Sequence, residues 1–194
     1  MMTKGTLCAA LAVIAATTLT DGGALAQTAP DPNAVATPDA TPAAAAAADN
    51  LTAVTFEGGR YLTADGVPTF KIAADGTMDW ATYSGFRRYH SECHVCHGPE
   101  GEGSAYAPAI KNSAVRLSYY DFIAVVANGR TVVNAAQNQV MPTFGTNPNV
   151  MCYLDDIYTY LKARGSEALP RGRPSKKEPK PDAIRDAEAA CLGL

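Results

Sequence analysis

The run Cys93-His94-Val95-Cys96-His97 brings two thiols and an adjacent imidazole together. A Cys-x-x-Cys-His run is the sequence by which a haem is covalently attached: both thiols add to the haem vinyl groups, and the adjacent histidine becomes an axial ligand of the iron. We therefore predict one covalently bound haem, with Cys93 and Cys96 as attachment residues and His97 as an iron ligand.

The same two thiols allow two alternatives, which stay open at this point. A redox dithiol would be expected at a helix start within a βαβ unit, and a zinc site would need further ligands from His90, His94 and His97. His90 and His94 are also rival iron ligands. Both lie so close to His97 in the sequence that reaching the opposite face of a haem is hard.

A six-coordinate haem that carries electrons needs a second axial ligand on its opposite face, commonly a methionine thioether. Met141 is the candidate, because it lies far beyond the haem motif and precedes Pro142, which stiffens the chain. A methionine can equally fill a core. Met78 and Met151 fit that role better, since Met78 precedes the motif and Met151 starts a predicted helix.

The histidine ligand also needs an acceptor for its second ring N–H. The carbonyl of Pro108 is the predicted acceptor, at the end of the glycine- and proline-rich segment 98–109. Arg130 and Asn128 follow a predicted helix and could neutralise a haem propionate. The alternative for Arg130 is a plain exposed side chain.

Residues 1–26 have the pattern of a secretory signal peptide, with Lys4, an apolar run from Leu7 to Leu19 and the cleavage site Ala24-Leu25-Ala26. A membrane anchor is the alternative, but the run is shorter than the ~20 residues that span a bilayer. Export predicts a periplasmic protein without stable membrane insertion, in a compartment where disulfides persist and haem is attached. The net charge of −3 argues against a nucleic-acid partner.

Cys8 would leave with the signal, so the exported chain keeps Cys93, Cys96, Cys152 and Cys191. The last two are not needed for the haem, and in an oxidising compartment we predict that they form a disulfide. This bond would tie the C-terminal tail to the start of a helix. The alternative is a pair of free thiols.

The elements that must position these residues are predicted to be helical. A first helix, capped by Asp79, ends near the haem motif; a second runs from its cap Ser118 to Gly129; a third covers 151–164. Together they predict an all-α domain at 79–164, with room for one haem in its core.

The flanking segments differ in composition. Residues 27–50 are rich in alanine and proline without an aromatic residue, which predicts a disordered linker. Residues 51–78 alternate β-prone pieces with glycine turns and predict a small β-hairpin extension. Residues 165–194 form a tail that ends in a short helix, and 164–180 carry six basic and two acidic residues. This basic stretch is either a solvated linker or a docking patch for an acidic partner.

The haem motif, Pro108 and the run Met141-Pro142-Thr143-Phe144 occur in the order found in class I cytochromes c, which the chain resembles. Gly85 and Tyr89 resemble that family's pair at the crossing of its first and last helices. More closely, Arg88 to Pro99 and Asn149 to Tyr158 resemble the four-cysteine cytochromes associated with methanol metabolism, the cytochrome c-553i type. The resemblance spans roughly 51–194, and Cys152 and Cys191 match the extra cysteine pair.

This resemblance implies a class I cytochrome c fold around one haem c, and an electron carrier rather than an enzyme. It implies a pyrroloquinoline quinone methanol or alcohol dehydrogenase as the electron donor, and a cytochrome or terminal oxidase as the acceptor. A general respiratory shuttle is one alternative. A haem enzyme or gas-binding protein is another, but it would need an open axial position, which a His/Met pair does not leave.

Overall fold

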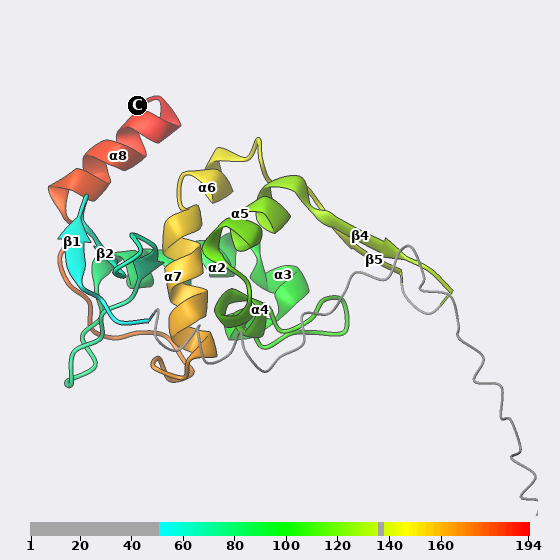
Figure 1. Ribbon diagram of the computed structural model, residues 1–194, viewed down its shortest axis with the longest axis horizontal. Helices are drawn as coiled ribbons and strands as arrows, with labels where there is room; N and C mark the ends of the chain where they lie inside the picture. The colour runs from blue at the N-terminus through cyan, green and yellow to red at the C-terminus, as the bar shows by residue number, and fades with distance from the viewer. Residues whose placement is uncertain (1–50, 136–137) are drawn as a thin grey trace, which may run out of the picture. The chain divides into compact units, whose positions relative to one another are not determined.

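The computed structural model describes residues 51–135 and 138–194, all within one compact unit that runs from Asp39 to Leu194. The predicted signal peptide (1–26) and linker (27–50) lie outside the described residues. The described helices are α2 (Trp80–Glu92), α3 (His94–His97), the 3-10 helix η1 (Pro99–Gly101), α4 (Ile110–Arg116), α5 (Tyr119–Asn128), α6 (Pro148–Met151), α7 (Leu154–Gly165) and α8 (Asp182–Leu192) (Figure 1). The described strands are β1 (Thr55–Glu57), β2 (Arg60–Leu62), β3 (Pro68–Thr69), β4 (Arg130–Val133) and β5 (Asn138–Met141).

Helix α2 begins where the sequence predicts. Asp79 accepts hydrogen bonds from the backbone N–H of Thr82 (2.9 Å) and from its hydroxyl (2.6 Å), which satisfies a free donor of the first turn. The Asp79 carboxylate also accepts the N–H of Lys71 (2.8 Å), so the cap ties the preceding segment to the helix. Helix α2 then runs to Glu92, and the haem motif follows directly.

Helix α7 is the centre of the core, since nearly all its residues are buried, and it crosses α2. Gly85 allows this crossing, because a Cβ atom there would lie 1.9 Å from the backbone oxygen of Asp156. Large apolar side chains from the two helices and their neighbours fill the rest of the core: Tyr89, Phe122, Val126, Val150, Leu154, Ile157, Tyr158, Tyr160 and Leu161.

The predicted third helix over 151–164 is present as α7, but it starts later, at Leu154, because Met151 ends a separate helix, α6. Helix α6 has its own cap, the Asn147 side chain, which accepts the N–H of Asn149 (2.9 Å), and Pro148 occupies its first turn. Tyr153 then leaves the helical region at φ −125° and ψ 14°, which separates the two helices. Apolar periodicity alone does not show such a break.

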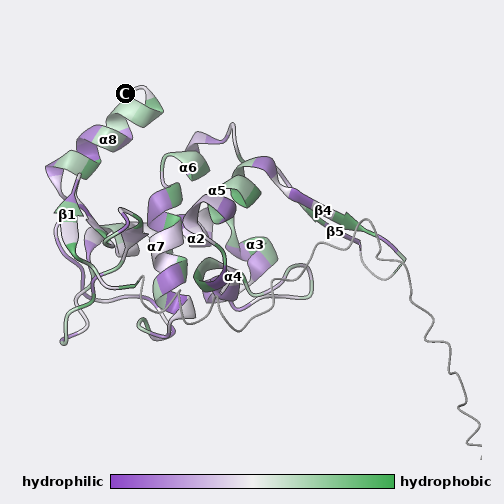
Figure 2. Cartoon of the chain, in the orientation of Figure 1, coloured by the Kyte–Doolittle hydropathy of each residue, from purple (hydrophilic) through white to green (hydrophobic). Residues whose placement is uncertain are grey.

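Helices predominate, but the all-α prediction is incomplete because two small antiparallel sheets are present. Strands β1, β2 and β3 form one sheet, with one strand more than the predicted hairpin. Strands β4 and β5 form the other, with Arg130 opposite Met141. Gly129 ends α5 with φ 72°, a left-handed backbone, and the β-branched residues after it favour a strand. Figure 2 shows hydrophobic residues on this β4–β5 ribbon, where Val133 and Val140 are each 63% exposed.

The C-terminal tail is bonded to the domain, while most residues of its basic stretch at 170–180 are exposed, as the prediction of a solvated segment expects. The backbone around Met78 exchanges hydrogen bonds with the tail: its N–H donates to the carbonyl of Lys176 (3.3 Å), and its carbonyl accepts the N–H of Glu178 (2.8 Å). Helix α8 follows, and its Ile184 is fully buried against Gly59 of the β1–β2 turn. None of the described helices is long and apolar enough to cross a membrane.

Candidate functional site

The haem motif lies at the junction of two helices. Cys93 follows the last residue of α2 and donates its N–H to the carbonyl of Tyr89 (2.9 Å), while Cys96 and His97 lie on the single turn of α3. Cys93 is half-buried and Cys96 exposed, and neither is in a disulfide. The junction therefore presents both thiols and the imidazole from one rigid helical corner.

The ring of His97 is oriented by the loop that follows it. Its Nδ1 lies 3.0 Å from the carbonyl oxygen of Pro108, the acceptor that the sequence predicts. Because a carbonyl only accepts, Nδ1 carries a proton, and in the neutral ring Nε2 then keeps its lone pair. A lone pair on Nε2 is what an iron ligand requires, and the Pro108 contact fixes the tautomer that supplies it.

The loop itself is very tight. The N–H of Gly103 donates to the carbonyl of His97 (2.8 Å), and the Ser104 hydroxyl donates to the carbonyl of Cys96. Gly98 has φ 74°, and a Cβ atom there would lie 2.1 Å from the carbonyl oxygen of Gly103. Only glycine fits such a backbone, which folds the loop back under the motif.

Tyr89 links helix α2 to this loop. It is fully buried, and its hydroxyl donates to the carbonyl of Gly98 (2.6 Å). Burial raises the pKa of this phenol well above its ordinary value, so the hydroxyl stays a donor at all physiological pH values. The hydrogen bond joins the helix crossing to the residue directly after His97.

The surroundings of Cys93 disfavour the thiolate form of its side chain. Burial, followed by the charges of Glu92 and Cys96, raises its pKa to about 12. A redox dithiol and a zinc site both need a thiolate at neutral pH. Among residues 51–135 and 138–194, no group of three or more His, Cys, Asp or Glu side chains is arranged to hold a metal ion. The buried Cys93 thiol and the lack of such a group among the described residues therefore do not support a redox dithiol or a zinc site.

His90 is engaged elsewhere. Its Nδ1 lies 2.8 Å from the Phe86 carbonyl, and its Nε2 accepts the N–H of Glu100 (3.4 Å). His94 stacks on the His90 ring with centroids 5.9 Å apart. With both of its nitrogens in hydrogen bonds, His90 is poorly placed to bind an iron.

Met141, the predicted second ligand, ends strand β5 and is half-buried against the core. The backbone there approaches Gly129 so closely that a Cβ at Gly129 would lie 2.6 Å from the Met141 oxygen. Arg130 lies opposite Met141 across the ribbon and is exposed. Met78 is fully buried, and Met151 packs against the same core, as core-filling residues do.

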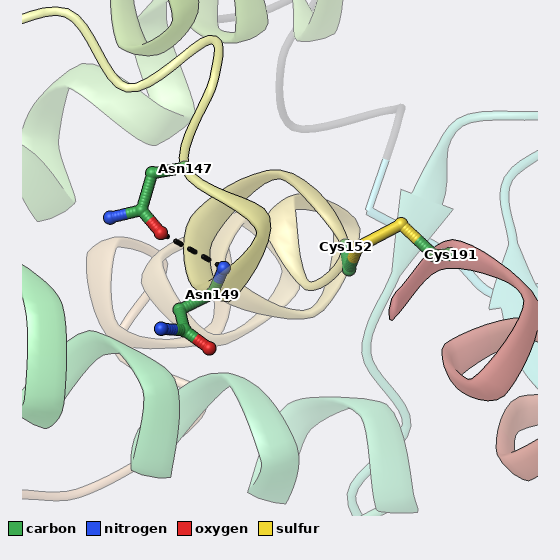
Figure 3. Close-up of a disulfide and its surroundings, with 4 residues drawn as sticks. All are labelled: Asn147, Asn149, Cys152 and Cys191. Atoms are coloured by element: carbon green, nitrogen blue, oxygen red, sulfur yellow. Dashed lines mark hydrogen bonds between the residues drawn. A yellow bond between two sulfur atoms is a disulfide. The ribbon is translucent and has the colours of Figure 1, made fainter. Parts of the chain in front are cut away.

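Cys152 and Cys191 form a disulfide, with Cα atoms 5.8 Å apart and a sequence separation of 39 residues. Figure 3 shows the bond between the end of α6 and the end of α8, beside the Asn147 cap. The bond thus joins the C-terminal helix to the turn from which α7 starts.

Sequence reasoning missed the residues that hold the loop after the motif. Glu100 and Glu102 point into a cluster of cations formed by Lys111, Arg164 and Arg171. The sequence offered a faint signal, two acidic residues beside the motif and a basic tail, but nothing in it shows that the two meet.

Known relatives decide the family. Cytochrome c-553I of Paracoccus denitrificans is 58% identical over 137 residues, which is 71% of this chain and 61% of that protein. Cytochrome c-555 of Methylococcus capsulatus (strain Bath) is 39% identical over 107 residues, which is 55% of this chain and 80% of that protein. The chain belongs to the c-type cytochromes.

A solved structure confirms the fold of this cytochrome. The crystal structure of the c-type cytochrome XoxG from Methylobacterium extorquens AM1 matches with a TM-score of 0.71 and 51% identity, over 80% of this chain and 95% of that chain. The predicted class I cytochrome c fold and the resemblance to the c-553i type are thus confirmed. The match spans only about three fifths of the Paracoccus protein's length. No family model matches the chain.

As a c-type cytochrome, the protein carries covalently attached haem c. The residues present fit this group: two free thiols on neighbouring turns, and beside them an imidazole whose Nε2 lone pair is available because Nδ1 contacts Pro108. Cys93 and Cys96 would hold the haem through thioethers, and His97 would bind its iron.

Proposed function

We propose that this protein is a periplasmic, monohaem electron carrier, not an enzyme. The observation that supports the proposal best is the fixed tautomer of His97, whose Nδ1 contact with Pro108 leaves Nε2 for the iron. Haem c supplies the one-electron chemistry when it is bound. The protein's own residues would hold His97, and with it Met141, in place as iron ligands.

Met141 is proposed as the second axial ligand. Its place at the end of β5 is held by the ladder with β4 and by the close approach at Gly129. When haem c is bound, a methionine thioether together with a histidine imidazole would favour the reduced iron and give a fairly positive potential. Arg130, exposed and opposite Met141, is proposed to lie near a haem propionate.

The proposed electron donor is a pyrroloquinoline quinone methanol or alcohol dehydrogenase, and the proposed acceptor is a cytochrome or terminal oxidase. Support for the donor is the four-cysteine pattern: the pair Cys152–Cys191 accompanies the haem cysteines, as in the cytochromes of methanol metabolism that the chain resembles. The similarity to cytochrome c-553I and to XoxG supports the coarser part of the proposal, a c-type cytochrome that carries electrons.

Stopped-flow mixing tests the donor. The oxidised cytochrome is mixed with a reduced quinoprotein methanol dehydrogenase and, separately, with reduced donors of other classes from the same periplasm. We expect much faster haem reduction by the dehydrogenase. Equal rates with every donor would favour a general respiratory shuttle instead.

Carbon monoxide tests the ligand set. The reduced protein is expected to bind carbon monoxide slowly or not at all, because Met141 occupies the sixth position. Rapid binding by the unmodified protein would contradict Met141 ligation and favour a gas-binding protein or haem enzyme. Export is tested separately, by the N-terminal sequence of the protein recovered from periplasm.

A further inference from the structure

The loop from Gly98 to Gly103 controls the backbone of the haem motif. It starts at the residue after His97, and the hydrogen bond from the Gly103 N–H returns to the His97 carbonyl. The same loop accepts the Tyr89 hydroxyl at Gly98. Any group that holds this loop in place therefore also holds the peptide that carries His97.

Glu100 occupies an unfavourable position in the middle of this loop. Its φ is 61°, a left-handed backbone that residues other than glycine, asparagine and aspartate rarely adopt. It is also only 9% exposed, although an isolated carboxylate strongly prefers water. Both costs must be offset by specific partners.

Those partners come from the far end of the chain. The Glu100 carboxylate accepts hydrogen bonds from the Nε–H of Arg171 (2.8 Å) and from the backbone N–H of Gly172 (2.5 Å). The Nη2 of Arg164 lies 3.7 Å from Oε2 of the same carboxylate. Burial alone would raise the pKa of Glu100, but these donors outweigh it and lower that pKa. Glu100 is thus held as a carboxylate by the segment that directly follows α7.

A second carboxylate, that of Glu102, joins these contacts. We call the cluster of ion pairs formed by Glu100, Glu102, Lys111, Arg164 and Arg171 the clasp. The Oε1 of Glu102 accepts hydrogen bonds from the Nζ of Lys111 (3.0 Å) and from the Nη2 of Arg164 (2.8 Å). Arg164 is buried at the end of α7, so it bridges both acidic residues of the loop from a rigid helix. By contrast, Lys176 in the same tail forms its ion pair with Asp75 and not with the Glu100 or Glu102 carboxylate, and both side chains of that pair are more than half exposed.

We propose that Glu100, clasped by Arg171 and Arg164, is a positioning residue for His97: the tail locks the loop and so sets the orientation of the imidazole toward the haem iron. This rests on the proposed role of His97 as an iron ligand. The basic tail then acts within the molecule, because Arg171 forms an ion pair with Glu100 of the loop and Lys176 forms one with Asp75.

The test uses the complete haem-loaded protein and three variants, Glu100→Gln, Arg171→Gln and the control Lys176→Gln. The control removes one positive charge from the same tail without touching the loop. The readouts are the hyperfine-shifted haem methyl resonances of the oxidised protein, which follow the orientation of the axial ligands, and hydrogen exchange at the Gly103 N–H.

Glu100→Gln and Arg171→Gln are expected to move the haem methyl resonances in the same direction and to speed exchange at Gly103 about tenfold, since either change breaks a charge-assisted hydrogen bond of the clasp. Lys176→Gln should change neither readout. Unchanged haem methyl resonances in both variants would overturn the proposal. Shifts of opposite sign in the two variants would also overturn it, because the simple Coulomb effect of a lost charge has opposite signs for an acid and a base.

Arg171 is 71% exposed on its side chain, so Arg171→Gln is expected to fold even if Glu100→Gln does not. The outcome is also separable from the proposed function. Electron transfer from a dehydrogenase plays no part in either readout, and a failed donor assignment leaves the haem methyl comparison intact.

Discussion

Replacing both Cys152 and Cys191 by serine should lower the free energy of unfolding substantially. The disulfide closes a loop with a sequence separation of 39 residues. In the chain-entropy estimate, opening a loop of about 40 residues costs about 4 kcal/mol. Since domains of this kind are stable by roughly 5–15 kcal/mol, this is a large part of the total.

The structure indicates that α8 should remain docked in the double variant. Ile184 is buried against Gly59, and the Nζ of Lys180 lies 5.8 Å from the ring centroid of Trp80 in α2. The loss should therefore appear as weaker global stability, not as a detached tail. In guanidinium chloride, with a slope near 4 kcal/mol per molar, the unfolding midpoint should fall by roughly 1 M.

The assay is equilibrium unfolding followed by far-ultraviolet circular dichroism. Ascorbate is present in every sample, so that the iron is reduced and only the disulfide differs. The unmodified protein treated with dithiothreitol should match the serine variant, and the variant itself should not respond to dithiothreitol. A midpoint within 0.2 M of the unmodified protein would refute the reasoning, because the tail would then lie outside the cooperative unit.

Three further outcomes follow from the core and the site. Gly85→Ala places a Cβ 1.9 Å from the Asp156 carbonyl oxygen, so α2 and α7 must separate. We expect the free energy of unfolding to fall by an amount near or above the upper end of the usual ~1–3 kcal/mol for overpacking. The control Arg87→Ala, on the exposed side of α2, should leave that free energy nearly unchanged. Burial, only partly offset by Arg60, raises the pKa of Asp156 to about 6, so the folded state holds a proton that the unfolded chain has released. The contribution of Asp156 to the free energy of unfolding should therefore fall by about 2 kcal/mol as the pH rises from about 4 to 6, and denaturant unfolding of Asp156→Asn should show a flatter pH profile. Met141→Ala should make the reduced protein bind carbon monoxide rapidly, as read from its visible spectrum; unchanged binding would contradict the proposed ligand.

Local chemistry explains what could be predicted. The haem motif, the Asp79 and Ser118 caps and the stop at Gly129 depend on residues adjacent in the sequence, and the structure has these elements where the patterns indicate. The Pro108 contact could be anticipated because a histidine ligand needs a nearby acceptor and a tight loop supplies one.

The failures have a common cause in longer-range contacts. The β4–β5 ribbon forms only because two short stretches, 130–133 and 138–141, pair with each other, and the break between α6 and α7 lies at Tyr153. Short apolar runs fit a helix and a strand equally well, so periodicity could not separate these cases.

The chemistry of this cytochrome can be predicted from its amino-acid sequence: which residues can bind a haem, which can cap a helix and which cysteines remain to pair. The folded chain is needed to see that the basic tail returns to the haem loop and that Glu100 is buried against Arg171 and Arg164. The difference arises because covalent and capping chemistry acts between near neighbours. Ion pairs between distant segments form only after the core has brought those segments together.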